Sequence, residues 1–89
     1  MIYKPNADDK FIFEYMTTIH NRFSGTTEQF FCETDADIDE VIDFCRARFD
    51  LPMSGDDGID WWQTVGSVVP ADINGRTGYL FKAFTPSTD

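Results

Sequence analysis

Apolar residues recur with two different periods along the chain. Within residues 38–49 they return every three or four positions, which lines up one face of an α-helix. The apolar positions are Ile38, Val41, Ile42, Cys45 and Phe49. Asp37 is a candidate N-cap for this helix, and Glu40, three residues later, can complete a capping box. We therefore predict one amphipathic helix in the middle of the chain, ended by Pro52.

Four other segments are predicted to be β-strands. In residues 10–20 and 77–84 apolar and polar residues alternate, residues 28–33 are a strand-like run, and residues 61–69 are rich in β-branched and aromatic residues. Gly25 favours a turn between the first two segments, which we expect to form an antiparallel hairpin. Asn74-Gly75 marks a tight turn before the last segment. For residues 61–69, a short helix capped by Asp57 or Asp60 is the alternative.

Two strand faces are expected in the core. In the first strand the odd-numbered positions form this face, and in the last strand the face contains three apolar residues. The predicted core residues are Phe11, Phe13, Tyr15, Thr17 and Ile19 in the first strand, and Tyr79, Phe81 and Ala83 in the last. Residues 53–60, rich in Gly, Ser and Asp, are expected to form an exposed loop.

The resulting order is ββαββ, which predicts an α+β fold. We expect a small, mostly antiparallel sheet with the one amphipathic helix packed on one face. A chain of 89 residues can bury a single core, so residues 1–89 form one domain, with 1–9 and 85–89 loosely ordered. Cys32 and Cys45 are expected to be reduced thiols in that core.

Net charge restricts the class of partner. The chain has 7 basic and 16 acidic residues, a net charge of −9. Nucleic acid and anionic membranes attract the opposite sign, so neither is expected to bind directly. The sequence has no signal-peptide pattern and no apolar run near the roughly 20 residues that span a bilayer. We expect a cytoplasmic protein without a membrane segment.

The acidic residues are concentrated in the predicted helix and in the loop that follows it. On the helix they occupy an arc opposite the apolar stripe, which we expect to be uniformly anionic. The candidate partner-binding acids are Asp35, Asp39, Glu40, Asp43, Asp56, Asp57 and Asp60. A solvated face on an acidic protein is the alternative interpretation. If the chain's own basic residues neutralised these acids, a basic partner would find little to recognise.

Trp61 and Trp62 are the second candidate feature. In a strand, adjacent side chains point to opposite faces, so one ring would be in the core and the other partly exposed. An exposed Trp beside acidic residues would act as an anchor in a protein interface. The alternative is that both rings are buried in a core short of apolar material.

The strand-to-helix junction resembles a known group of proteins. Between Phe30 and Phe49 a strand ends in an acid-rich turn, with Asp37 at the helix cap and Glu40 three residues on. This pattern resembles the junction in small phage-encoded inhibitors, including anti-CRISPR proteins and a phage inhibitor of host RNA polymerase. The resemblance covers about a quarter of the chain, concerns the fold, and carries over no binding residue.

The sequence gives little evidence for a catalytic site or a metal site. His20 is the only histidine, and no third group is apparent that could orient a pair of His20 and Cys32. The repeat of Asp at 35, 37 and 39 suggests a calcium loop, but such a loop needs Gly at its sixth position and Glu at its twelfth. Glu40 and Arg46 stand there instead. We expect no enzyme activity, no metal and no cofactor.

Three classes of function remain. The first is an acidic inhibitor that blocks a basic, nucleic-acid-handling surface of a host protein by steric or charge mimicry. The second is an acidic assembly module, without inhibitory role, that self-associates through its sheet edge or an aromatic patch. The third is a small enzyme or metal protein. We expect the first, with a monomer or a homodimer binding a basic protein surface.

Overall fold

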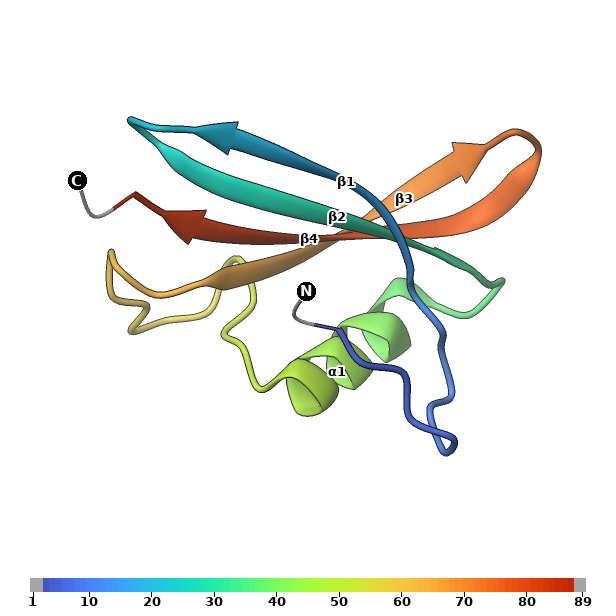
Figure 1. The fold of residues 1–89 in the computed structure, drawn as a ribbon. Coiled ribbons are helices and arrows are strands. Elements are labelled where there is room, and N and C mark those ends of the chain that lie inside the picture. Colours follow the sequence, from blue (N-terminus) through green and yellow to red (C-terminus); the bar gives the residue numbers. More distant parts are fainter. Residues whose placement is uncertain (1–2, 88–89) are drawn as a thin grey trace.

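A single antiparallel sheet with one helix across it forms the whole domain (Figure 1). The computed structural model describes residues 3–87. Its elements are β1 (Glu14–Asn21), β2 (Gly25–Glu33), α1 (Ile38–Phe49), β3 (Val65–Ile73) and β4 (Arg76–Pro86). The strands lie in the spatial order β1-β2-β4-β3, so β1 and β3 are the two edges. The predicted α+β fold and its ββαββ order are confirmed.

The core lies between the sheet and α1 and consists largely of aromatic rings. Phe30 of β2 and Phe81 of β4 are completely buried there. The Phe81 ring stacks on Phe49 of α1, with ring centroids 4.6 Å apart. Tyr3 and Phe13 reach the same cluster from the segment before β1. Large rings from four segments thus give a short chain enough buried apolar surface to fold.

The predicted core face of the first strand is correct only at its beginning. Phe11 and Phe13 are buried, but they precede β1, and every residue of β1 is exposed. The register shifts between Tyr15 and Thr17, where Met16 forms a β-bulge. Because a bulge adds one residue, it moves Thr17 and later odd-numbered residues to the opposite face of the sheet. Thr17 and Ile19 are therefore not core residues.

The helix buries the face that its periodicity predicts. Val41 and Cys45 are buried, and Ile38, Ile42 and Phe49 pack against the core. The predicted capping box is wrong, because the Asp37 side chain makes no cap hydrogen bond and the Glu40 carboxylate pairs with Lys10 instead. The helix ends at Phe49. The N–H of the following Asp50 still bonds to the carbonyl of Arg46, and the left-handed backbone of Asp50 then turns the chain out of the helix.

The predicted third strand starts too early. Trp61 and Trp62 lie in a turn, and β3 runs from Val65 through Pro70 to Ile73. The helical alternative for this segment is also wrong. Asn74-Gly75 makes the predicted tight turn to β4, with positive φ at both residues. On β4 the predicted face is confirmed, since Phe81 and Ala83 are buried and Tyr79 packs against the core.

The remaining predictions concern the thiols, the loop and the termini. Cys32 and Cys45 are free, buried thiols, as expected. The predicted exposed loop is wrong at Met53, which is buried and forms a parallel bridge with Gly66. Of the predicted loose ends, residues 1–2 and 88–89 lie outside the described residues. Thr85 and Pro86 belong to β4.

Candidate partner-binding surface

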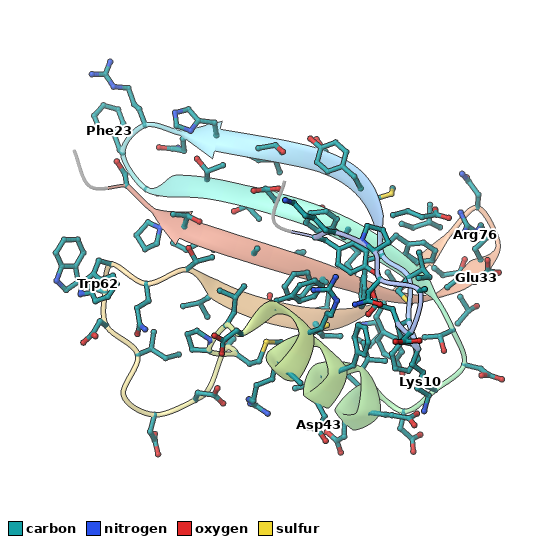
Figure 2. The ribbon with its side chains drawn as sticks, turned by 60° about the horizontal axis from the view of Figure 1, so that its bottom comes forward. Lys10, Phe23, Glu33, Asp43, Trp62 and Arg76 are labelled. Atoms are coloured by element: carbon teal, nitrogen blue, oxygen red, sulfur yellow. The ribbon has the colours of Figure 1, made fainter. Side chains whose placement is uncertain are left out.

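The acidic arc of α1 faces solvent, as its periodicity predicts. Asp39, Glu40 and Asp43 are all exposed, and the Asp43 side chain points away from the sheet (Figure 2). Negative side chains in the first turn suit the positive end of the helix dipole, which favours Asp39 and Glu40 there. The sheet supports this arc from behind, because Val41 and Cys45 on the opposite side of the helix are buried against it.

The expectation that the arc is uniformly anionic is wrong, because basic side chains compensate part of it. Lys10 pairs with Glu40. Arg46 lies 2.7 Å from Asp56 in the following loop and 3.6 Å from Asp43. The backbone N–H of Met53 and the Arg46 guanidinium together lower the pKa of Asp56. Three of the predicted binding acids therefore have a basic neighbour within the chain.

The other predicted acids keep their charge uncompensated. Within the described chain, Asp39, Asp57 and Asp60 are exposed and form no ion pair. Asp35, just before α1, is also exposed and unpaired. It borders a shallow hollow of about 500 Å³ together with Asp72 and Tyr79. The uncompensated acids thus fall into two groups: Asp35 and Asp39 at the start of α1, and Asp57 and Asp60 in the loop that follows it.

Both tryptophans project from the surface of the same loop. The side chains of Trp61 and Trp62 are 75% and 56% exposed, so the expectation of one buried ring is wrong, and so is the alternative of two. Neither ring belongs to the core, because the turn at residues 60–63 comes before β3 begins. Two adjacent, exposed Trp side chains are costly in water and are enriched at interface anchors.

Specific hydrogen bonds give this loop a defined shape. The N–H of Asp60 donates to the Gln63 side chain at 2.8 Å, and the N–H of Gln63 donates to the Asp60 carbonyl at 3.1 Å. Further back, Asp56 is tied to α1 through Arg46, and Gly66 is hydrogen-bonded to Pro52 and Ser54. The tryptophans are therefore carried by a turn with both ends fixed, which lowers the entropy lost on binding.

Sequence reasoning missed a third exposed aromatic side chain. Phe23, at the tip of the β1–β2 hairpin, is 84% exposed, with Arg22 over its ring. Figure 2 shows Phe23 and Trp62 at the same end of the sheet. The register agrees, since Gly25 pairs with Pro86 at this end and Val65 pairs with Phe84. An aromatic residue inside a turn-forming segment was the available signal, because turns lie at the surface.

His20 is exposed, whereas Cys32 and Cys45 are both buried. The Nδ1 atom of His20 lies 2.7 Å from the Thr26 hydroxyl on the exposed part of the sheet. Burial raises the pKa of the Cys45 thiol to about 12 and also raises that of Cys32, which disfavours the reactive thiolate. Within residues 3–87, no three side chains of His, Cys, Asp or Glu are grouped as a metal site.

Comparison with known proteins does not indicate a function. No helix in the described part of the chain is both long enough and apolar enough to cross a membrane. No family model matches the sequence, and no curated protein or solved structure is significantly similar to it. The chemistry of the exposed side chains is therefore the basis for a proposed function.

Proposed function

We propose that this chain is a non-catalytic binding protein that docks its Trp61–Trp62 loop and the adjoining acids on a basic surface of another protein. The observation that supports this most directly is the exposure of both tryptophans beside Asp57 and Asp60. By covering a surface that handles nucleic acid, it would act as an inhibitor in the cytoplasm of the cell that contains its partner. Charge mimicry of nucleic acid would contribute to this effect.

The chemistry of the loop favours Arg and Lys side chains. A cation over the face of a Trp ring is stabilised by about 0.5 to 2 kcal/mol, depending on solvent exposure. A carboxylate beside the ring can accept hydrogen bonds from the same guanidinium or ammonium group. Asp57, Asp60 and the two rings supply both kinds of contact on one loop.

The charge of the whole chain supports the same class of partner. Only 7 of its side chains are basic against 16 that are acidic, and four of the basic ones are already in ion pairs. The resulting field speeds association with a basic surface and slows association with an acidic one. Salt should therefore weaken binding to the partner.

The two tryptophans provide their own reporter for a test, because the chain has no other Trp. The protein is titrated with an arginine-rich peptide while Trp fluorescence is recorded at low and high salt. The expected result is saturable binding that changes the emission and weakens with salt. In a second arm, a fluorescent single-stranded oligonucleotide is bound to the peptide first, and the protein is expected to release it.

Matched variants locate the interaction. Asp57→Lys should weaken peptide binding about tenfold or more, since it replaces an attraction by a repulsion in the loop that carries the rings. Asp72→Lys makes the same charge change near the β3–β4 turn, away from the Trp loop, and should have a much smaller effect. Equal losses in the two variants, or binding without any change in Trp emission, would contradict the proposal.

A further inference from the structure

The two edges of the sheet differ in how their backbone groups are used. On β3, the N–H of Gly66 donates to the Pro52 carbonyl at 2.9 Å, and its carbonyl accepts from Ser54 at 2.7 Å. Further along β3, Pro70 has no N–H to offer. On β1, by contrast, no backbone hydrogen bond within residues 3–87 is formed on the side away from β2. The edge of β1 is open.

The open edge also lacks the usual protection against pairing with another strand. Exposed edges are normally guarded by charged residues, proline or a bulge. The bulge of β1 lies at its beginning, and the five residues Thr17–Asn21 then pair regularly with β2. None of these five is Asp, Glu, Lys, Arg or Pro, and all are exposed. They offer a short, regular template for one more strand.

Charge favours a second copy of this chain at this edge. The stretch from residue 10 to residue 28 contains two basic and two acidic residues, whereas residues 33–60 contain two basic and ten acidic residues. Of the two acids near β1, Glu14 is paired with Arg76 and Glu28 lies on β2 opposite Thr18. Two copies that meet along β1 therefore keep their acidic sides apart, although each has a net charge of −9.

We infer that β1 pairs with β1 of a second copy, antiparallel and about a two-fold axis, to form a continuous eight-stranded sheet. A two-fold interface uses the same patch on both copies. The register centred on Ile19 pairs all of Thr17–Asn21 with the same segment of the other copy and avoids the bulge. Ile19 then lies opposite Ile19 of the second copy. Its side chain is on the sheet face away from α1, because its partner on β2, Thr27, is three positions from the core residue Phe30 and therefore faces the other way.

This dimer does not depend on the proposed function. β1 and the Trp loop belong to opposite edges of the sheet, since the loop leads into β3. A dimer through β1 leaves both tryptophans exposed for a partner. The two associations also respond differently to salt: salt weakens the contact with a basic partner but screens the repulsion between two acidic copies. Failure of one can therefore be recognised separately from failure of the other.

Sedimentation equilibrium tests the dimer, at protein concentrations from about 10 μM to 1 mM under reducing conditions. The expected result is a reversible dimer that is favoured by added salt. Ile19→Lys should raise the dissociation constant at least about tenfold, because it places two like charges opposite each other. Val69→Lys places the same charge on the same sheet face, but on the other edge strand. It should alter the dissociation constant of the dimer by no more than about twofold.

Cysteine cross-linking tests the register. Strands that pair directly opposite each other bring Cα atoms to about 4.5–5.5 Å, within the range of a disulfide. Ile19→Cys should form a disulfide-linked dimer on mild oxidation, whereas Thr18→Cys and Val69→Cys should not. A chain that stays monomeric up to 1 mM, or a dimer disrupted equally by Ile19→Lys and Val69→Lys, overturns the inference. So does cross-linking through position 69 rather than 19.

Discussion

The α1 side and the β1 edge of this small domain differ in both packing and charge. The α1 side carries the buried aromatic cluster and most of the acids, and three basic side chains there, Lys10, Arg46 and Arg48, form ion pairs. The β1 strand has eight exposed residues and a single acid, which is paired. The residues that stabilise the fold are thus concentrated on the α1 side, whereas the side chains of β1 are not part of the core.

Two surfaces of one domain can therefore favour different kinds of partner. The loop with Trp61 and Trp62 combines aromatic rings with free carboxylates, which suits cations. The edge of β1 combines open backbone groups with the stretch Thr17–Asn21, which has no Asp, Glu, Lys or Arg, and this suits another strand. Each experiment below tests whether the two regions are as separate as the structure indicates.

The largest expected effect is on folding and comes from the α1 side. Phe81→Ala removes a completely buried ring that stacks on Phe49, and it should lower the free energy of unfolding by about 3–5 kcal/mol. Ile19→Ala, on the exposed edge, should change it by no more than about 0.5 kcal/mol. Urea denaturation at low protein concentration, where a dimer does not contribute, measures both.

Phe81→Leu serves as a second core variant if the alanine variant does not fold, because whole-domain stabilities are only about 5–15 kcal/mol. It keeps a large apolar side chain and should lose less than the alanine variant. A loss above about 1 kcal/mol in Ile19→Ala would mean that β1 supports the core after all, and the contrast between the two regions would fail.

The second expected effect is a divergence in salt dependence. Between about 50 and 500 mM sodium chloride, binding of the arginine-rich peptide should weaken about tenfold, or about 1.4 kcal/mol. The dimer should strengthen over the same range, because the repulsion between two chains of charge −9 is screened. Fluorescence titration and sedimentation on the same preparation measure the two. If both associations weakened with salt, the dimer would have to be held by attraction between opposite charges. The acidic side of one copy would then contact basic residues of the other, and the contact would not be at β1 alone.

Much of the fold followed from hydrophobic periodicity. The spacing of Val41, Cys45 and Phe49 predicts the helix face that the structure buries, and alternation predicts the core face of β4. The first strand failed because a bulge at Met16 leaves no mark in the alternation of residue types. The third failed because Trp, Val and Thr are all typical of strands, whereas a hydrogen-bonded turn at residues 60–63 decided where β3 begins.

The candidate surface was predictable in its location but not in its charge. Periodicity correctly indicates that Asp39 and Asp43 face solvent. It cannot reveal that Lys10, 30 positions from Glu40, and Asp56, 10 positions from Arg46, meet the helix in space, because those contacts depend on how two loops return to it. The exposure of Phe23 and of both tryptophans likewise depends on the tertiary fold.

The smallest expected effect concerns Asp9, which joins the N-terminal segment to α1. Burial alone would raise the pKa of this carboxyl, but the N–H of Asn6, the Tyr3 hydroxyl and the Arg48 guanidinium at 3.0 Å together lower it below its ordinary value of 3.8. A lowered pKa in the folded state adds stability above the unfolded-state pKa, and this is lost as pH falls through the folded-state value.

Asp9→Asn should therefore be less stable than the natural chain at pH 7, and the difference should shrink as the pH falls below about 4. Urea denaturation at a series of pH values measures this difference. Ile19→Ala is the matched control, because it changes no titratable group and its difference from the natural chain should stay constant with pH. If the two variants behaved alike, Asp9 would contribute no charge-dependent stability, and acid would act equally on both regions of the domain.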